Sequence, residues 1–258
     1  MRWFSKIATL RQNLLWLLLP PHCYGCNQTW SYLCKHCTHK LYVHPEICPI
    51  CHATSRGFFV CQTCKPTADP LTGIIIWFGY VGIIKRLMLK FKYKHNFTIA
   101  DIIAQKLALH IRTHPHLQHQ KILLTHIPSH RSTITQKRGY TPSRLIAQRL
   151  STLIDAPYLP LLRKPQKTIS QTKLHKQERK HNPSNKRTPT KHAKKSLLSQ
   201  YNTILLIDDL TTTWSTIRHA ARALYQQSPD HQYRWVVVAR NRELDDKMRK
   251  RLYMDGRS

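Results

Sequence analysis

Eight cysteines in four Cys-x-x-Cys pairs are the feature that most restricts how this chain can fold. Two thiolates separated by two residues can bind one side of a tetrahedral metal ion, because the turn between them directs both sulfurs inward. The short loops that join the pairs cannot bury a core, so bound metal would supply their folding energy. We therefore predict a zinc ribbon module over residues 22–66. Its ligands would be all the cysteines of the chain: Cys23, Cys26, Cys34, Cys37, Cys48, Cys51, Cys61 and Cys64.

The sequence leaves open how the pairs share metal ions. Consecutive pairs could share one zinc ion, or the first pair could combine with the third and the second with the fourth. The even number of cysteines would also suit a disulfide framework, and a single pair would suit a redox dithiol. Four pairs at the spacing of zinc ribbons favour zinc over both.

The chain is strongly basic, with 42 Lys and Arg against 12 Asp and Glu and a formal charge of +30. Such a surface attracts polyanions through counterion release, so nucleic acid is the first expected partner and anionic lipid the second. The alternative is a basic composition that serves no partner. Residues 163–200 contain twelve Lys or Arg, one Glu and few bulky apolar side chains, which predicts a flexible, solvated loop. Its candidate nucleic-acid contacts are Lys186, Arg187, Lys191, Lys194 and Lys195.

Residues 1–21 imitate a secretion signal but are expected to form an N-terminal amphipathic helix. The apolar run at 14–19 is short, ends at Pro20 and offers no small-residue cleavage site. The run is too short to span a membrane, and we expect no span elsewhere in the chain. Close cysteine pairs are typical metal ligands of reducing compartments, so we expect a cytoplasmic protein.

From about residue 70 the sequence alternates between short apolar runs and segments of helical periodicity. The apolar runs predict strands at 74–78, 121–127, 203–207 and 234–239, and the periodic segments predict helices at 83–91, 101–111, 142–153 and 215–227. The strands are apolar throughout, which is typical of a parallel sheet covered by helices on both faces. We therefore predict an α/β domain over residues 70–240, followed by a C-terminal tail at 241–258.

Two adjacent acids, Asp208 and Asp209, directly follow the apolar strand at 203–207. Ligands of open α/β sheets bind at the carboxyl ends of the strands, where two carboxylates can accept hydrogen bonds from vicinal ribose hydroxyls. The hydroxyl-rich turn at 211–216 opens a helix, whose free N–H groups suit a phosphate. The same residues also suit simple helix capping, since Asp, Thr and Ser are preferred at a helix start. Chemistry alone leaves both interpretations open.

Residues 203–216 resemble the phosphoribosyl-pyrophosphate (PRPP) loop of type I phosphoribosyltransferases: a hydrophobic strand, Asp-Asp, two residues, then Thr-Thr-Gly-x-Thr. With its cysteine pairs, the chain from about Pro21 to Arg240 resembles the ComF family of competence proteins, in which a zinc ribbon precedes a phosphoribosyltransferase domain. Further matching motifs are Phe78-Gly79-Tyr80, Leu89-Lys90-Phe91, Arg138-Gly139-Tyr140, and Thr168, Gln171 and Leu174 with Arg179 and Asn182.

The resemblance implies a type I phosphoribosyltransferase-like fold and a PRPP site in which Mg²⁺ accompanies the ligand. By position, Asp208 and Asp209 would hold the ribose hydroxyls. The remaining PRPP contacts would be Thr212, Thr213 and Thr216 at the 5′-phosphate, and Arg131 in a pyrophosphate loop after residue 127.

The sequence departs from the family pattern at two places. Trp214 stands where the PRPP loop has glycine, and Thr141-Pro142 stands where the family has Asn-Gln after its Arg-Gly-Phe motif. Glycine permits a positive φ and close approach of the backbone to a phosphate, and tryptophan does neither cheaply. The departure bears on ligand binding and not on the fold.

Three functions fit these features. The favoured one is a ComF-like protein that assists natural transformation, binds single-stranded DNA and PRPP, and works with the DNA-uptake machinery. The second is a Mg²⁺-dependent phosphoribosyltransferase acting on a nitrogen nucleophile, although no base-specificity segment is recognisable. The third is a degenerate scaffold that binds no nucleotide. Aromatic residues of the ribbon could stack on bases, but they more often form its small core: Trp30, Tyr32, Tyr42 and Phe58.

Overall fold

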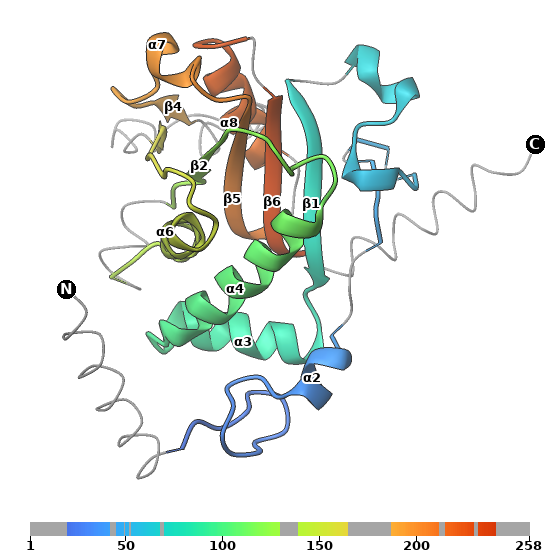
Figure 1. Cartoon of the computed structure of the whole chain (residues 1–258), viewed down its shortest axis with the longest axis vertical. Coiled ribbons are helices and arrows are strands. Elements are labelled where there is room, and N and C mark those ends of the chain that lie inside the picture. Colours follow the sequence, from blue (N-terminus) through green and yellow to red (C-terminus); the bar gives the residue numbers. More distant parts are fainter. Residues whose placement is uncertain are drawn as a thin grey trace, which may run out of the picture.

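The computed structural model describes residues 20–41, 45–48, 50–51, 53–67, 70–129, 139–164, 187–211, 215–229 and 232–240. Its centre is a four-stranded parallel sheet with the order β1-β6-β5-β2 (Figure 1). The strands are β1 (Leu71–Gly79), β2 (Ile122–His126), β5 (Thr203–Thr211) and β6 (Gln232–Arg240). A single parallel bridge between Leu124 and Tyr158 extends the sheet beyond β2. The predicted α/β fold with a parallel sheet is confirmed.

Helices cover both faces of the sheet, because each strand is apolar on both sides. On one face lie α3 (Gly82–Tyr93), α4 (Thr98–Thr113) and α6 (Pro142–Ile154), packed against Leu205 and Ile207 of β5. On the other face lie α7 (Lys195–Leu198) and α8 (Ser215–Tyr225), packed against Ile204 and Leu206. Because each face of the sheet has its own hydrophobic core, β5 carries an unbroken apolar run.

The short elements belong to the cysteine region and to the segment after α6. They are α2 (Lys35–His39), the 3₁₀ helices η1 (Arg56–Phe58) and η2 (Gln62–Thr67), and the antiparallel pair β3 (Leu162–Arg163) and β4 (Thr188–Pro189). Within the part of the chain that the structure describes, no helix combines the length and apolar character needed to cross a bilayer.

The chain leaves β2 and β5 toward opposite faces of the sheet. After β2 it passes to α6 on one face, and after β5 it passes to α8 on the other, while β2 and β5 are paired from Ile122↔Thr203 to His126↔Ile207. Adjacent parallel strands whose connections diverge in this way leave a crevice at their carboxyl ends, where α/β proteins bind ligands. The fold thus places residues 127–129 and 208–211 at one site.

The structure differs from the expected flexible loop over residues 187–200. β4 pairs with β3, the N–H of Thr190 donates to the carbonyl of Leu161 at 2.8 Å, and Ala193 and Leu198 are buried in the core beneath α8. The buried side chains of Ala193 and Leu198, together with the two-residue strand β4, hold this stretch against the α/β domain. Residues 165–186 lie outside the described residues, as do the predicted amphipathic helix up to residue 19 and the tail at 241–258.

Candidate functional site

The eight cysteines form two separate clusters of four. Cys23, Cys26, Cys34 and Cys37 make one, Cys48, Cys51, Cys61 and Cys64 make the other, and the sulfurs of each lie within 4.8 Å of one another. Consecutive pairs therefore share a site, which decides between the two arrangements left open by the sequence. All eight cysteines are free, so a disulfide framework does not fit.

The sulfur geometry fits a tetrahedral zinc ion. Sγ of Cys34 lies 3.6 Å from Sγ of both Cys23 and Cys26, and the Cys51–Cys61 sulfurs are also 3.6 Å apart. Four sulfurs bound at about 2.3 Å from zinc would lie about 3.8 Å from each other. A Cβ at Gly25 would collide with Sγ of Cys37, so the turn between Cys23 and Cys26 requires glycine at this position.

Backbone N–H groups in the cysteine loops donate hydrogen bonds to the sulfurs, and these bonds stabilise the thiolate form. Burial opposes ionisation of Cys23 and Cys48, but N–H donors outweigh it and lower their pKa values to about 6 and about 7. The N–H groups of Gly25 and Cys34 lie 3.4 Å from Sγ of Cys23. Burial and the neighbouring thiols raise the pKa of Cys37 to about 12. Four thiolates so close together ionise together only around a cation, which is what zinc supplies.

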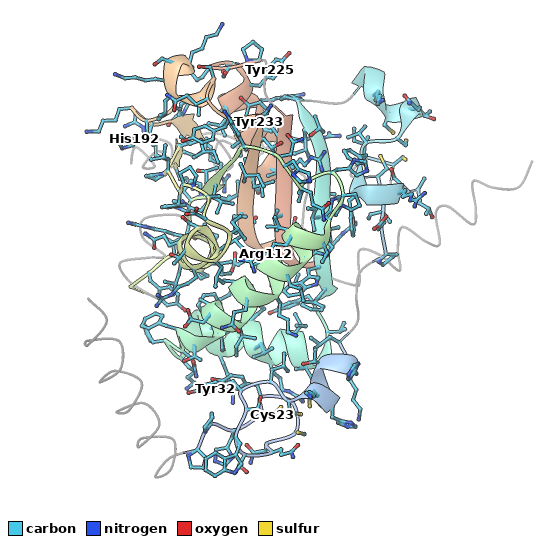
Figure 2. All side chains as sticks on the ribbon, viewed as in Figure 1. Cys23, Tyr32, Arg112, His192, Tyr225 and Tyr233 are labelled. Atoms are coloured by element: carbon cyan, nitrogen blue, oxygen red, sulfur yellow. The ribbon has the colours of Figure 1, made fainter. Side chains whose placement is uncertain are left out.

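The two cysteine clusters dock on different parts of the α/β domain (Figures 1 and 2). The first lies against α3, where Arg86 donates to the carbonyl of Gly25 at 3.0 Å and Nζ of Lys90 lies 4.9 Å from the ring centre of Tyr24. The second lies along the outer edge of β1, where Ile47 and Phe58 enter the sheet core. A Cβ at residue 73 would lie 2.8 Å from the carbonyl oxygen of Phe58, so glycine permits this close approach.

A polar crevice of about 190 Å³ opens at the carboxyl ends of β2 and β5. Basic, acidic and hydroxyl groups converge on it from elements far apart in the sequence. Its lining residues are Ile127, Pro128, Ser129, Lys164, Arg187, Asp208, Leu210, Thr211 and Thr216. A larger depression of about 680 Å³ lies at the opposite end of β2; it too has one acid, Asp155, but its described lining includes no Ser or Thr. The chemistry favours the smaller crevice as the ligand site.

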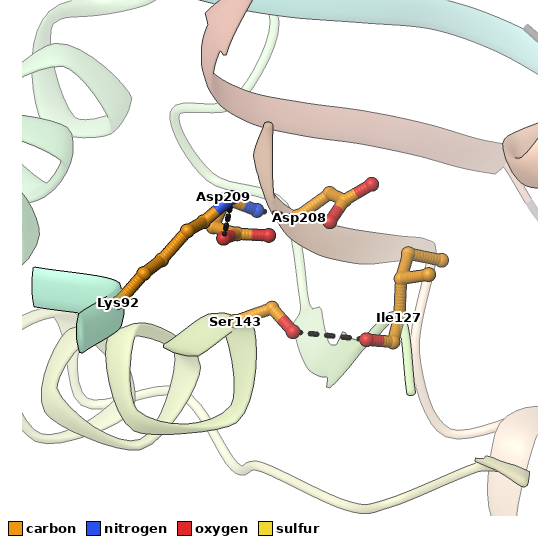
Figure 3. A network of polar contacts seen from close by, with 5 residues as sticks. All are labelled: Lys92, Ile127, Ser143, Asp208 and Asp209. Carbon is orange, nitrogen blue, oxygen red and sulfur yellow. Dashed lines mark hydrogen bonds and ion pairs between the residues drawn. The ribbon is translucent and has the colours of Figure 1, made fainter. Parts of the chain in front are cut away.

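The two adjacent acids turn toward opposite faces of the sheet, since neighbouring residues of a strand alternate (Figure 3). Asp208 lines the crevice and is 8% exposed. Asp209 turns toward α3, and its Oδ2 lies 2.8 Å from Nζ of Lys92, both side chains being almost buried. One carboxylate therefore faces the crevice, and the other is neutralised from behind.

The pKa of Asp208 lies well above the ordinary value of 3.8. Burial is the main cause, and repulsion from Asp209 adds to it, while Lys92 and the N–H of Asp209 act in the opposite direction. That N–H donates to Oδ1 of Asp208 at 2.9 Å. A ligand that brings hydrogen-bond donors or a cation would stabilise the ionised form of this buried carboxyl.

The end of β2 is held in place by buried polar contacts. Oγ of Ser143 donates to the carbonyl of Ile127 at 2.9 Å (Figure 3), which ties the start of α6 to the crevice. His126 pairs its Nδ1 with the hydroxyl of Tyr158 at 2.8 Å. Burial, with a smaller contribution from Arg144, lowers the pKa of His126 to about 4, so the ring is neutral near pH 7. These contacts fix the backbone at the end of β2, next to the crevice residues 127–129.

The predicted site residues fall into three groups. Asp208 and Thr216 line the crevice, and Asp209 adjoins it. Arg187 also lines the crevice and is buried, whereas Lys191, Lys194 and Lys195 are exposed beyond β4. Four predicted residues and the departing loop position lie outside the described residues: Arg131, Lys186, Thr212, Thr213 and Trp214.

Sequence reasoning missed Lys92, Lys164 and Ser129. The burial of Lys92 could have been inferred from the sequence. The buried positions of α3 follow the helical series 84, 87, 88, 91 and 92, and a lysine occupies the last of them. A buried lysine needs an acid as its partner, and the chain has few. Ser129 and Lys164 left no signal, since only the fold brings them to Asp208.

No protein-family profile matches the chain. It is 24% identical over 219 residues to competence protein F of Haemophilus influenzae, in an alignment that covers 76% of this chain and 91% of that protein. The chain is similar to competence protein F over most of the length of both proteins. Because the alignment covers nearly all of competence protein F, the similarity is not confined to a single motif. With the two Cys₄ clusters, it confirms the resemblance to the ComF family drawn from the sequence.

Proposed function

We propose that this chain is a competence-related protein that binds PRPP, or a ribose phosphate of the same kind, in the crevice at the ends of β2 and β5. The observation that carries the proposal is the placement of Asp208. It stands at the switch point of the sheet and lines the same crevice as Arg187, Lys164, Thr211 and Thr216. A carboxylate facing cations and hydroxyls suits a ligand that carries both ribose hydroxyls and phosphates.

The arrangement of the acids supports one ribose-facing carboxylate with a fixed neighbour. Asp208 is directed into the crevice, and Lys92 holds Asp209 at 2.8 Å behind it. Lys92 compensates the charge of Asp209 and so weakens the repulsion between the two neighbouring acids. Asp208 is then the carboxyl that a hydroxyl donor, or a Mg²⁺ ion accompanying PRPP, would meet in the crevice.

Zinc in the two Cys₄ clusters is the second part of the proposal. Each cluster would hold one ion, and each ion would fix a loop region against the α/β domain, the first against α3 and the second against β1. In this role zinc is structural, because all four ligands of each cluster come from the protein and no coordination position is left open.

The third part is a role in handling incoming single-stranded DNA in the cytoplasm, together with the DNA-uptake machinery. The formal charge of +30 and the name of the H. influenzae relative support it. Binding through phosphates would weaken steeply as salt is added. An oligothymidine titration by fluorescence anisotropy at several salt concentrations tests this part: no binding at low salt, or an affinity indifferent to salt, would remove nucleic acid as the partner.

A Mg²⁺-dependent phosphoribosyl transfer to a nitrogen nucleophile is the alternative function. Thermal unfolding with PRPP alone, with PRPP and Mg²⁺, and with pyrophosphate separates the proposals. Ligand at one hundred times its dissociation constant stabilises by about 2.7 kcal/mol, so a binding protein should melt higher. Release of pyrophosphate in the presence of candidate bases would establish the enzyme instead. No shift with any ligand would establish the degenerate scaffold.

A further inference from the structure

The outer face of α3 carries two parallel stripes of side chains that the crevice does not use. Residues four apart lie on one side of a helix, one turn from each other. Leu89 and Tyr93 form an apolar stripe, which Phe97 continues just beyond the helix, and all three are exposed. Beside it runs a basic stripe of Arg86, Lys90 and Lys94, and Lys85 lies one turn before Leu89 at the start of the apolar stripe; all four basic residues are exposed. We refer to the two stripes together as the α3 face.

Two large aromatic side chains are about half exposed on this face, although such residues are mostly buried in soluble proteins. Tyr93 is 52% exposed and Phe97 is 45% exposed. The ring of Phe97 packs edge-on against the ring of Tyr140, with their centres 5.0 Å apart. In the first cysteine cluster, Tyr24 stacks on Tyr32 at 5.9 Å beneath the Lys90 ammonium, and Trp30 is 58% exposed.

The α3 face and the cysteine cluster beneath it contain no carboxylate. Residues 20–41 and 71–100 lack Asp and Glu altogether. The nearest described acids are engaged elsewhere: Asp101 pairs with Arg149 at 3.0 Å, and Asp209 pairs with Lys92 on the buried side of α3. A surface with many cations, no acids and exposed rings attracts a polyanion whose own flat groups are free to stack.

We propose that the α3 face is a stacking surface for single-stranded nucleic acid. Lys85, Lys90 and Lys94 neutralise backbone phosphates, and Tyr93 and Phe97 stack on unpaired bases. This inference rests on the nucleic-acid part of the proposed function but moves the contact away from Lys191, Lys194 and Lys195. Those lysines lie beyond β4, where Tyr225 is the exposed large aromatic of the adjoining helix α8. A duplex hides its bases from stacking, so the face prefers single strands.

Two matched sets of variants test the location, with oligothymidine and a blunt duplex as probes. Lys85, Lys90 and Lys94 changed together to Gln remove three charges from the α3 face, and the control set, Lys191, Lys194 and Lys195 to Gln, removes three elsewhere. Each phosphate contact to a single strand contributes about 0.7 to the slope of log affinity against log salt. The α3 set should reduce that slope by about 2, and the control set should leave it near the wild-type value.

The stacking itself is tested by Tyr93→Ala with Phe97→Ala, against Tyr225→Ala, which removes an exposed ring (41%) from α8. Loss of two stacked bases should weaken oligothymidine binding at least tenfold and duplex binding little, while Tyr225→Ala should change neither. Unchanged melting temperature and zinc content show that the variants fold. If the wild type binds no oligothymidine, the nucleic-acid proposal fails. If it binds but the α3 variants behave like their controls, this inference alone fails.

Discussion

Nζ of Lys92 and Oδ2 of Asp209 form an ion pair of 2.8 Å across 117 positions of the sequence, in a site where both side chains are almost buried. The pair joins the end of α3 to the end of β5, and it lies directly behind the carboxylate that faces the crevice (Figure 3). It connects the packing of the domain to the charge of its candidate site.

Removing one member of this pair should destabilise the protein more than removing both. Lys92→Met leaves Asp209 as an unpaired buried charge, which costs about 3 kcal/mol. Lys92→Met with Asp209→Leu should recover most of that loss, because neither a buried charge nor the repulsion with Asp208 remains. Urea unfolding of the wild type, both single variants and the double variant measures the coupling. Additive effects would show that the two side chains do not interact in solution.

Asp208→Asn should stabilise the free protein at neutral pH. The pKa of Asp208 is raised in the folded state, so the unfolded chain loses its proton first, and stability falls as the pH rises from about 4 toward the folded pKa. Asparagine removes this loss. The variant should melt higher than the wild type at pH 7 to 8, and the difference should disappear as the pH falls well below the ordinary pKa of 3.8, where the carboxyl is protonated in both states. A difference that is constant with pH would contradict the raised pKa.

The two cysteine clusters should lose zinc independently, because they share no ligand. Metal analysis should find two equivalents in the wild type and about one in either Cys23→Ser or Cys48→Ser. Cys48→Ser should lower the melting temperature more, since Ile47 and Phe58 of that half lie in the sheet core. Loss of both ions from one substitution, or disulfides in place of zinc, would contradict the geometry.

Trp214→Gly should strengthen PRPP binding. Glycine restores the backbone freedom that the PRPP loop of type I phosphoribosyltransferases uses at this position, and it removes a large side chain. The shift of melting temperature with PRPP should increase in the variant, and Asp208→Asn in the same background should abolish the gain. A Trp214→Gly protein that PRPP does not stabilise would mean that the site has decayed beyond this residue, as the scaffold hypothesis holds.

Much of the architecture followed from local pattern. The apolar runs at 203–207 and 234–239 predicted β5 and β6, and the helical period at 83–91 predicted α3, because burial on one or both faces imposes the repeat directly. The acid pair at the end of a strand was likewise predictable, since parallel strands bring their carboxyl ends to one edge.

The remainder depends on contacts between distant segments, which the sequence does not encode locally. Cys-x-x-Cys spacing is the same whichever pairs share a metal, so only the folded loops show that consecutive pairs do. The order of residues 187–200 rests on β3–β4 pairing and on Leu198 entering the core, a weak signal in a very basic stretch. Arg187 was predicted among the nucleic-acid contacts, yet that pairing turns it into the crevice.

Isothermal titration calorimetry measures whether the crevice between β2 and β5 binds PRPP through Asp208. PRPP with Mg²⁺ is titrated into zinc-loaded wild-type protein and into Asp208→Asn, with Asp155→Asn at the opposite depression as the matched control. We expect saturable binding to the wild type and the control, and at least tenfold weaker binding to Asp208→Asn, although that variant should be the more stable protein. Equal binding to all three proteins, or no binding to the wild type, would show that Asp208 does not bind PRPP in this crevice.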